Sequence, residues 1–250
     1  MSADPGAVGR LFAGTSGFAY AAWKPAFYPD KLAAAKFLSY YATRLNAVEI
    51  NYTFRRLAAA STFEGWIAQT PADFVFACKA HQKITHFQRL GESEFNEVFF
   101  RSLEPLRLQR RLGPVLFQLP PQFLLDLGRL EAFLKQTPED VRCAFEFRNK
   151  SWLNEDVYAA LEAHGAALCL AESDNLAIPE RLTAGFVYFR LRKSVYEPED
   201  RREIAERVAG ITAGGRDAYV FFKHEETPDG ALYAEELLGS QGRSEPDQRK

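Results

Sequence analysis

Short apolar runs alternate with longer amphipathic segments along almost the whole chain. Eight of these runs have the length and composition of buried strands, namely residues 10–15, 47–51, 74–79, 114–119, 142–147, 167–171, 185–191 and 218–223. Successive side chains of a strand point to opposite faces. In the fifth run, Glu146 and Arg148 therefore share one face, and Phe145 and Phe147 share the other. Two charges on one face of a buried strand are costly unless they pair or meet a ligand.

Segments with helical spacing of their apolar residues lie between the strands, at residues 32–45, 61–69, 92–110, 127–136, 153–163, 199–209 and 230–238. We expect Ser151 to cap the helix 153–163 and Gly165 to end it. This alternation predicts a parallel sheet, and eight such units in 250 residues favour an α/β fold with a single-domain, TIM-like (β/α)8 barrel over residues 10–239.

A doubly wound open sheet is the alternative architecture. The first strand is not followed by a Gly-x-Gly-x-x-Gly motif, which weakens a dinucleotide-binding version of that fold. Residues 1–9 are expected to form an N-terminal tail. Residues 240–250 are polar and lack aromatic side chains, which predicts a disordered C-terminal tail.

Composition narrows the function classes. The formal net charge is −2, so the basic footprint of a protein that coats nucleic acid is absent, although a local basic pocket is compatible with it. Cys78, Cys143 and Cys169 each sit in an apolar run and form no C-x-x-C pair, which predicts buried free thiols in a reducing compartment. Neither a signal sequence nor a bilayer-spanning segment is visible, so we expect a cytoplasmic protein without a membrane partner.

In barrels of this type, the site lies at the carboxyl ends of the strands. The polar residues there are Thr15, Ser16, Glu49, Asn51, Lys79, His81, Gln118, Glu146, Arg148, Glu172, Asp174, Arg190, Arg192, Lys223 and His224. If the bulky apolar face of each strand meets the helices, alternation turns seven of them into the barrel mouth: Glu49, Lys79, Gln118, Glu146, Arg148, Arg190 and Lys223. The assignment is weakest on the sixth and eighth strands, where both faces are apolar.

Two interpretations of this charged set stay open. The carboxylates could simply neutralise the cations and close the barrel top as an ion-pair network. Alternatively, the arginines and lysines hold a small anionic or phosphate-bearing ligand, because guanidinium forks match carboxylate and phosphate oxygens. In that case Lys79, Gln118, Arg148, Arg190, Lys223 and Asn51 are the predicted ligand-binding residues. Glu49 and Glu146 are the candidate acid or base of an enzyme.

A nucleic-acid-binding or repair-type protein and a non-catalytic interaction protein are the alternative functions. Tyr20, Trp23, Phe27, Tyr28, Phe54 and Trp152 could rim the mouth as a platform for bases or sugars, although packing is the commoner role for such residues. His81 and His86 flank Ile84 and Thr85, but the chain has only four histidines. We therefore predict no metal centre and no cofactor.

Several motifs, in this order along the chain, resemble the YecE-like family of unknown function (domain of unknown function 72). They are Gly14-Thr15-Ser16-Gly17-Phe18 with Phe27-Tyr28-Pro29, Val48-Glu49-Ile50-Asn51 with Thr53-Phe54, Ile84-Thr85-His86, Gln118-Leu119-Pro120-Pro121, Phe145-Glu146-Phe147-Arg148 with Ser151-Trp152, and Phe221-Phe222-Lys223-His224-Glu225. The resemblance implies a TIM-like barrel, a fold that has been likened to sugar isomerase and endonuclease IV barrels. The family has no settled activity, so the resemblance assigns no catalytic roles.

The chain departs from the family pattern at two aromatic positions. Phe18 stands where the family often has Trp, and Phe54-Arg55-Arg56 stands where it often has Phe-Tyr-Arg. The multi-histidine metal set of endonuclease IV-like enzymes is not visible in the sequence, which argues against metal-dependent phosphodiester cleavage.

Overall fold

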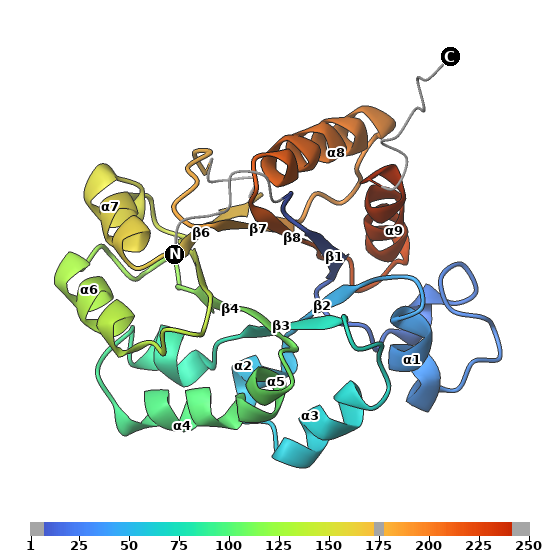
Figure 1. The fold of residues 1–250 in the computed structure, drawn as a ribbon, viewed down its shortest axis with the longest axis horizontal. Helices are drawn as coiled ribbons and strands as arrows, with labels where there is room; N and C mark the ends of the chain where they lie inside the picture. Colours follow the sequence, from blue (N-terminus) through green and yellow to red (C-terminus); the bar gives the residue numbers. More distant parts are fainter. Residues whose placement is uncertain (1–7, 173–177, 242–250) are drawn as a thin grey trace.

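The computed structural model describes residues 8–172 and 178–241. In this part of the chain, eight parallel strands form one sheet: β1 Leu11–Thr15, β2 Ala47–Ile50, β3 Val75–Lys79, β4 Leu112–Gln118, β5 Cys143–Glu146, β6 Ala167–Ala171, β7 Phe186–Leu191 and β8 Asp217–Phe222. Their order is β1-β8-β7-β6-β5-β4-β3-β2, and Figure 1 shows them as a ring surrounded by helices. The predicted TIM-like barrel is confirmed.

Helices cover the outside of this ring (Figure 1). They are α1 Phe37–Tyr41, α2 Tyr52–Arg55, α3 Ala60–Ile67, α4 Glu94–Ser102, α5 Glu104–Leu108, α6 Leu127–Gln136, α7 Glu155–Ala163, α8 Pro198–Ala213 and α9 Asp229–Gln241. Short helical turns occupy Ala21–Trp23, Ala34–Lys36, Lys83–Phe87 and Lys150–Trp152. Among the described residues, no helix is long and apolar enough to cross a bilayer.

Four of the predicted helices differ by more than two residues from the observed ones, among them the helix expected at 199–209, which extends to Ala213 as α8. The expected helix 92–110 divides at Leu103, because Pro105 lacks an N–H and can occupy only the first turn of a new helix, α5. The expected helix 32–45 shrinks to a 3-10 turn and the short α1. α9 extends to Gln241, beyond its expected end at residue 238 and into the segment expected to be the tail. Residues 242–250 lie outside the described residues.

The predicted cap of α7, Ser151, is wrong. Asn154, not Ser151, accepts a hydrogen bond from Val157 N at 3.2 Å, while Ser151 lies in the preceding 3-10 turn. The helix begins at Glu155, so Asn154 occupies the N-cap position, where asparagine and serine are about equally favourable. Gly165 follows α7 with a φ of +60°, so it does end the helix as predicted.

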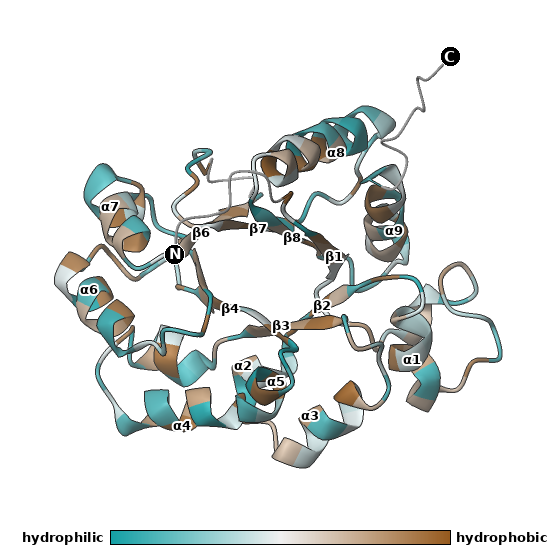
Figure 2. Ribbon diagram, viewed as in Figure 1, coloured by the Kyte–Doolittle hydropathy of each residue, from teal (hydrophilic) through white to brown (hydrophobic). Residues whose placement is uncertain are grey.

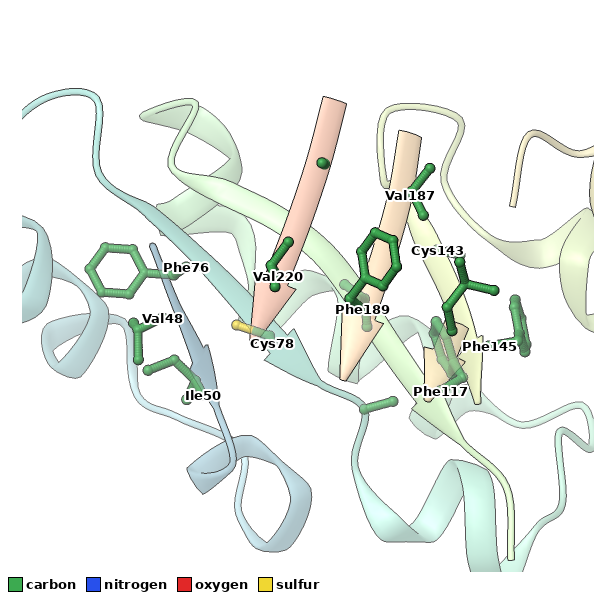
Figure 3. Close-up of a cluster of buried hydrophobic side chains, with 14 of the residues drawn as sticks. Val48, Ile50, Phe76, Cys78, Phe117, Cys143, Phe145, Val187, Phe189 and Val220 are labelled. Atoms are coloured by element: carbon green, nitrogen blue, oxygen red, sulfur yellow. The ribbon is translucent and has the colours of Figure 1, made fainter. Parts of the chain in front are cut away.

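The core has two layers separated by the sheet. The outer layer, between strands and helices, holds the bulky residues, and Figure 3 shows Val48, Phe76, Phe117 and Phe145 among them. The strands are correspondingly apolar, and the helices carry hydrophilic residues over much of their outer surface (Figure 2). Alternation along each strand produces this division.

The inner layer is filled unevenly around the barrel. Strands β2 to β6 contribute mainly small residues there, such as Ala47, Ala77 and Ala144. Strands β1, β7 and β8 contribute large aromatic rings that occupy the space left by the alanines, namely Phe12, Phe186, Tyr188, Tyr219 and Phe221. Phe12 and Tyr219 stack with their ring centroids 4.7 Å apart. The interior below the mouth is therefore packed solid, and only its upper end is free for chemistry.

The seam between β1 and β2 closes largely through side chains. Within the described residues its only β-bridge joins Ser16 and Glu49. Lower down, the Asn46 amide replaces the missing ladder: its Oδ1 accepts from Ala13 N at 2.9 Å, and its Nδ2 donates to Leu11 O at 2.8 Å.

The buried Tyr41 hydroxyl completes this seam. It accepts a hydrogen bond from Thr15 N at 2.8 Å and donates one to Ala47 O at 3.0 Å. Gly14 is required here, because a Cβ at this position would lie 1.9 Å from Ala47 O and 2.6 Å from the Tyr41 hydroxyl. The tyrosine thus carries the hydrogen bonds that a strand ladder would otherwise supply.

We expect Tyr41→Phe to lower the free energy of unfolding by about 1–3 kcal/mol, because it leaves a buried N–H and a buried carbonyl without a partner. Urea denaturation measures this change. Tyr233→Phe is the matched control, since the Tyr233 hydroxyl makes no hydrogen bond to the described residues. Equal effects of the two substitutions would show that the seam does not depend on the hydroxyl.

Candidate functional site

Arg190, the inward-facing residue near the end of β7, is the centre of the barrel mouth. Its guanidinium is only 2% exposed and makes four hydrogen bonds. Nε and Nη2 form a fork on Glu49, at 2.8 and 2.7 Å. Nη1 donates to Glu146 at 2.5 Å and to Gln118 at 3.3 Å. One side chain thus joins the ends of β2, β4, β5 and β7.

Glu49 is fully buried and fully hydrogen-bonded. Besides Arg190, its Oε1 accepts from Ser16 Oγ at 2.7 Å and its Oε2 accepts from the Tyr188 hydroxyl at 2.8 Å. Burial by itself would raise the pKa of Glu49, but the charge and hydrogen bonds of Arg190, with those of Ser16 and Tyr188, outweigh it and lower the pKa. Glu49 is therefore ionised near neutral pH.

Glu146, the second carboxylate, faces three arginines. Oε2 accepts from Arg190, Oε1 accepts from Arg148 Nε at 3.1 Å, and Arg192 Nη2 lies 3.4 Å from the same Oε1. Burial opposes ionisation here as well, but Arg190, Arg192 and Arg148 together lower the pKa of Glu146 to about 2. A group this acidic is a weak proton acceptor.

Lys79 lies at the end of β3 on the inward face, and its Nζ stands 4.1 Å from the centroid of the Phe54 ring. Burial, followed by repulsion from Arg190, lowers the pKa of Lys79 to about 8. Its ammonium is thus much more acidic than that of an exposed lysine.

Cations outnumber anions in this cluster. With Lys79 protonated, Lys79, Arg148, Arg190 and Arg192 carry four positive charges, and Glu49 and Glu146 carry two negative ones. In the inner part of the cluster, Arg190 is enclosed by its hydrogen-bond partners and its charge is neutralised by Glu49 and Glu146. The excess positive charge lies on Arg148 and Arg192, whose side chains are 36% and 21% exposed, and on Lys79.

A cavity of about 1000 Å³ opens beside this charged cluster. Glu146, Arg148 and Arg192 form part of its wall, and Leu170, Phe189 and Leu191 give it an apolar side. Further charged residues that line it are Lys150, Lys193, Arg207 and the acidic Glu172. A volume of this size accommodates a small organic molecule that carries an anionic group and an apolar or sugar-like body.

Comparison with protein families gives one decisive match. Residues 12–250 match the family described as "Protein of unknown function DUF72". The chain belongs to this family. The resemblance found in the sequence motifs is thereby confirmed.

Relatives of this DUF72 chain are found both by sequence and by structure. The UPF0759 protein YunF of Bacillus subtilis (strain 168) is 36% identical over 140 residues, which are 52% of this chain and 49% of that protein. A DUF72 family protein of Thermotoga maritima, TM1631, has a crystal structure with a TM-score of 0.81 at 28% identity, and the match covers 94% of this chain and all (100%) of that one.

More distant structures share the architecture alone. A DUF72 family protein of Enterococcus faecalis V583 (EF0366) has a TM-score of 0.76 at 18% identity, covering 96% of this chain and 100% of that one. An AP endonuclease of family 2 from Brucella melitensis has a TM-score of 0.50 at 11% identity, covering 95% of this chain and 100% of that one. At these identities the likeness is one of fold.

The structure brings together most, but not all, of the predicted site residues. Glu49, Gln118, Glu146, Arg148 and Arg190 form one hydrogen-bonded cluster, with Lys79 beside it. Lys223 does not join them: its side chain is 41% exposed, and its Nζ lies 3.7 Å from Glu225. The inward alternation stops applying to Lys223 because β8 ends at Phe222.

Asn51 lies half-buried before α2 and makes no side-chain cap hydrogen bond to that helix. Asp174 falls outside the described residues. Of the aromatic residues expected at the rim, Trp23, Phe27, Tyr28 and Trp152 are buried in the core, so they have the packing role. Phe54 is half-buried and does reach the mouth, where it contacts Lys79.

Three residues of the hydrogen-bonded cluster at the mouth do not stand out in the sequence. Ser16 and Arg192 were only two of many strand-end candidates, and Tyr188 was not singled out. Tyr188 shares the inward face of β7 with Arg190, so alternation already contained the signal for it. Arg192 continues that face beyond the end of the strand.

The histidines lie in separate environments. His81 Nδ1 accepts from Lys83 N at 3.1 Å, His86 Nδ1 bonds Thr85 Oγ1 at 2.9 Å, and His224 Nε2 lies 3.3 Å from Ser194 O. Within residues 8–172 and 178–241, no three His, Cys, Asp or Glu side chains are grouped so that they could hold a metal ion. The expectation of no metal and no cofactor stays a prediction.

We expect Arg190→Met to lower the free energy of unfolding by about 3–5 kcal/mol near neutral pH, because it leaves Glu49 buried without a cation. The pH dependence should also change sign. In the natural protein the lowered pKa values of Glu49 and Glu146 contribute stability above their ordinary pKa of 4.5, and this stability is lost as the pH falls through the folded-state value, about 2 for Glu146.

In the variant, unpaired burial raises the pKa of Glu49, so its protonation stabilises the fold as the pH falls from about 7 to about 5. Denaturant unfolding at several pH values measures both effects. Adding Glu49→Gln to the Arg190→Met variant should restore about 1–3 kcal/mol of the free energy of unfolding. Arg202→Met is the control, since Arg202 forms only exposed ion pairs with Glu199 and Glu206. If the Arg190→Met variant instead loses stability on acidification like the natural protein, Arg190 is not the cation that keeps Glu49 ionised.

Proposed function

We propose that the mouth of this barrel binds a small anionic, most simply phosphate-bearing, ligand. The observation that carries this proposal is the surplus of two positive charges at a mouth that opens into a cavity. A purely structural ion-pair network would balance its charges, because uncompensated charge at low exposure is costly. An anion bound at the mouth would neutralise the two surplus positive charges.

Arg148 and Arg192 are the best-placed groups to receive the anion. Arg148 makes a single hydrogen bond, from Nε to Glu146, so its two terminal nitrogens have no partner among the described residues. Arg192 Nε donates to Glu172 O at 3.0 Å, which fixes the side chain, and its Nη2 makes only the long contact with Glu146. Both arginines line the cavity, and a guanidinium fork suits phosphate and carboxylate oxygens.

The two carboxylates best fit a positioning role. Glu49 holds Arg190, and Glu146 orients Arg148 and Arg192 from one oxygen. Glu146 also lines the cavity, so it is the better placed of the two candidate catalytic acids or bases. Gln118 contributes by fixing Arg190.

We also assign the chain to a reducing compartment such as the cytoplasm. Cys78, Cys143 and Cys169 are all free and buried, which supports this assignment.

We expect Arg148→Ala and Arg192→Ala each to weaken the binding of inorganic phosphate or a small phosphate monoester by about 10- to 100-fold, the value of one charge-assisted contact. Glu146 keeps Arg190 as its partner in both variants, so the free protein should lose little thermal stability. Thermal shift and isothermal titration measure the two effects. Arg107→Ala is the control, because Arg107 pairs with Asp140 near the start of β5, away from the mouth. Binding that is equally weakened by all three variants would contradict the site.

A nucleic-acid ligand is the second candidate, and the exposed rings at the rim support it. Phe87 is 73% exposed in the turn after β3, and Tyr52 is exposed directly after β2. Exposed rings next to cations can stack on unpaired bases. By contrast, a cavity at the mouth does not favour a non-catalytic interaction protein, for which a filled mouth was expected.

The double variant Tyr52→Ala/Phe87→Ala separates the two candidates. If the ligand is a nucleic acid, the variant should bind a short single-stranded oligonucleotide at least about tenfold more weakly, and the natural protein's affinity should fall steeply with salt. Phosphate binding should be unchanged in the same variant. Fluorescence anisotropy at several salt concentrations makes the measurement. An oligonucleotide affinity that is absent or insensitive to salt excludes this candidate.

A further inference from the structure

Lys79 is a half-buried lysine whose ammonium lies at the barrel mouth. Its Nζ forms no hydrogen bond or ion pair with the described residues and instead stands over the Phe54 ring. By comparison, Lys193 pairs with Asp200 at 2.8 Å, and Lys83 lies over the Phe95 ring from an exposed position. Lys79 alone among these three is half-buried at the barrel mouth.

The charged groups around Lys79 come from several elements. Glu49 is on β2, Glu146 and Arg148 are at the end of β5, Arg190 is on β7, and His86 is in the turn after β3. Both carboxylates are already committed to Arg190, so the remaining neighbours are cationic or neutral. Burial, followed by repulsion from Arg190, lowers the pKa of Lys79 to about 8, so a much larger fraction of its side chain is neutral near neutral pH than for an ordinary lysine.

We propose that Lys79 is a nucleophile that forms a Schiff base with the carbonyl group of a small anionic aldehyde or ketone. This inference rests on the proposed anion site, because Arg148 and Arg192 hold the phosphate or carboxylate of that compound. Lys79 does not itself line the cavity, but Arg148 does and is also one of the charged neighbours of Lys79, so the carbonyl end of the bound compound would point from Arg148 toward Lys79. A neutral amine next to an anion clamp is the arrangement that this chemistry requires.

The chemical step is balanced without an oxidant or reductant. The Nζ lone pair attacks the carbonyl carbon, a C–N bond forms, and the carbonyl oxygen takes a proton to give a carbinolamine. The hydroxyl then leaves as water and a protonated imine remains. The net change converts an ammonium and a carbonyl compound into an iminium and one water molecule.

His86 is the group best placed to exchange protons during this step. It packs against the same Phe54 ring as Lys79, and the centroids of the His86 and Phe54 rings are 5.1 Å apart. Its Nδ1 is hydrogen-bonded to Thr85 Oγ1. Burial, followed by the charges of Lys79 and Arg148, lowers the pKa of His86, so its ring is neutral near neutral pH and can accept a proton from the ammonium.

Reductive trapping tests the proposal. The protein is incubated with dihydroxyacetone phosphate or pyruvate in the presence of cyanoborohydride, and its peptides are mapped by mass spectrometry. We expect the peptide containing Lys79 to gain the mass of the compound minus one oxygen atom. The yield should rise with pH along a titration with its midpoint near 8.

Variants and a truncated probe give the controls. Lys79→Arg keeps the positive charge but should abolish trapping, and Lys79→Met should do the same while remaining folded, since no polar contact is lost. Lys83→Met should trap like the natural protein. Dihydroxyacetone, which lacks the phosphate, and the Arg148→Ala variant should each give at least about tenfold less adduct.

The outcomes separate this inference from the anion site itself. Stabilisation by dihydroxyacetone phosphate that depends on Arg148, without an adduct on Lys79, overturns the Schiff base and leaves the anion site standing. Absence of both binding and adduct overturns both. Adduct spread over Lys83 and other exposed lysines, or formed equally well with dihydroxyacetone, shows ordinary amine reactivity and also overturns the proposal.

Discussion

The guanidinium of Arg190, clamped between two buried carboxylates, is the interaction on which the upper end of the barrel depends. It connects β7 with β2 and β5, strands that are not its neighbours in the sheet, and Gln118 adds β4. Through Glu49 the same cluster reaches Ser16 at the end of β1, so it also secures the top of the β1–β2 seam. Removing these charges from water costs nearly as much free energy as their mutual attraction contributes. The cluster therefore acts chiefly to hold the strand ends in register.

This clamp divides the mouth into a saturated inner part and an unsaturated outer part. Arg190 and Glu49 have used nearly all their hydrogen-bonding capacity on protein groups. Arg148 and Arg192 share a single oxygen of Glu146, line the cavity and keep donors that have no partner among the described residues. The two interpretations of the charged residues, an ion-pair network and an anion-binding site, therefore each describe one part of the mouth. The inner ion-pair network supports an outer surface that can receive an anion.

The sequence predicted the architecture well because alternation is a local property. The inward placement of Glu49, Gln118, Glu146 and Arg190 required only the strand assignments and the period of two. Partner choice is different, since Glu49 and Arg190 are 141 positions apart and only the closed barrel brings them together. The errors arose where an element ended: α4 stops before Pro105, and β8 stops before Lys223. Periodicity is less reliable beyond the last residue of an element: it places Arg148 correctly after β5, but not Lys223 after β8.

Lys79 shows why residue type matters at the mouth as much as charge does. A group that only bound an anion would be served better by a guanidinium, which stays charged and offers a fork of donors. An amine offers less as a binding group but, unlike a guanidinium, can give up its proton and become a nucleophile. The surroundings of Lys79 favour that loss, because burial and the positive charge of Arg190 outweigh the attraction of Glu49 and Glu146, which both pair with Arg190. The clamp that holds the strand ends together thus also leaves one lysine of the mouth without an anionic partner, which is a condition for chemistry rather than for stability.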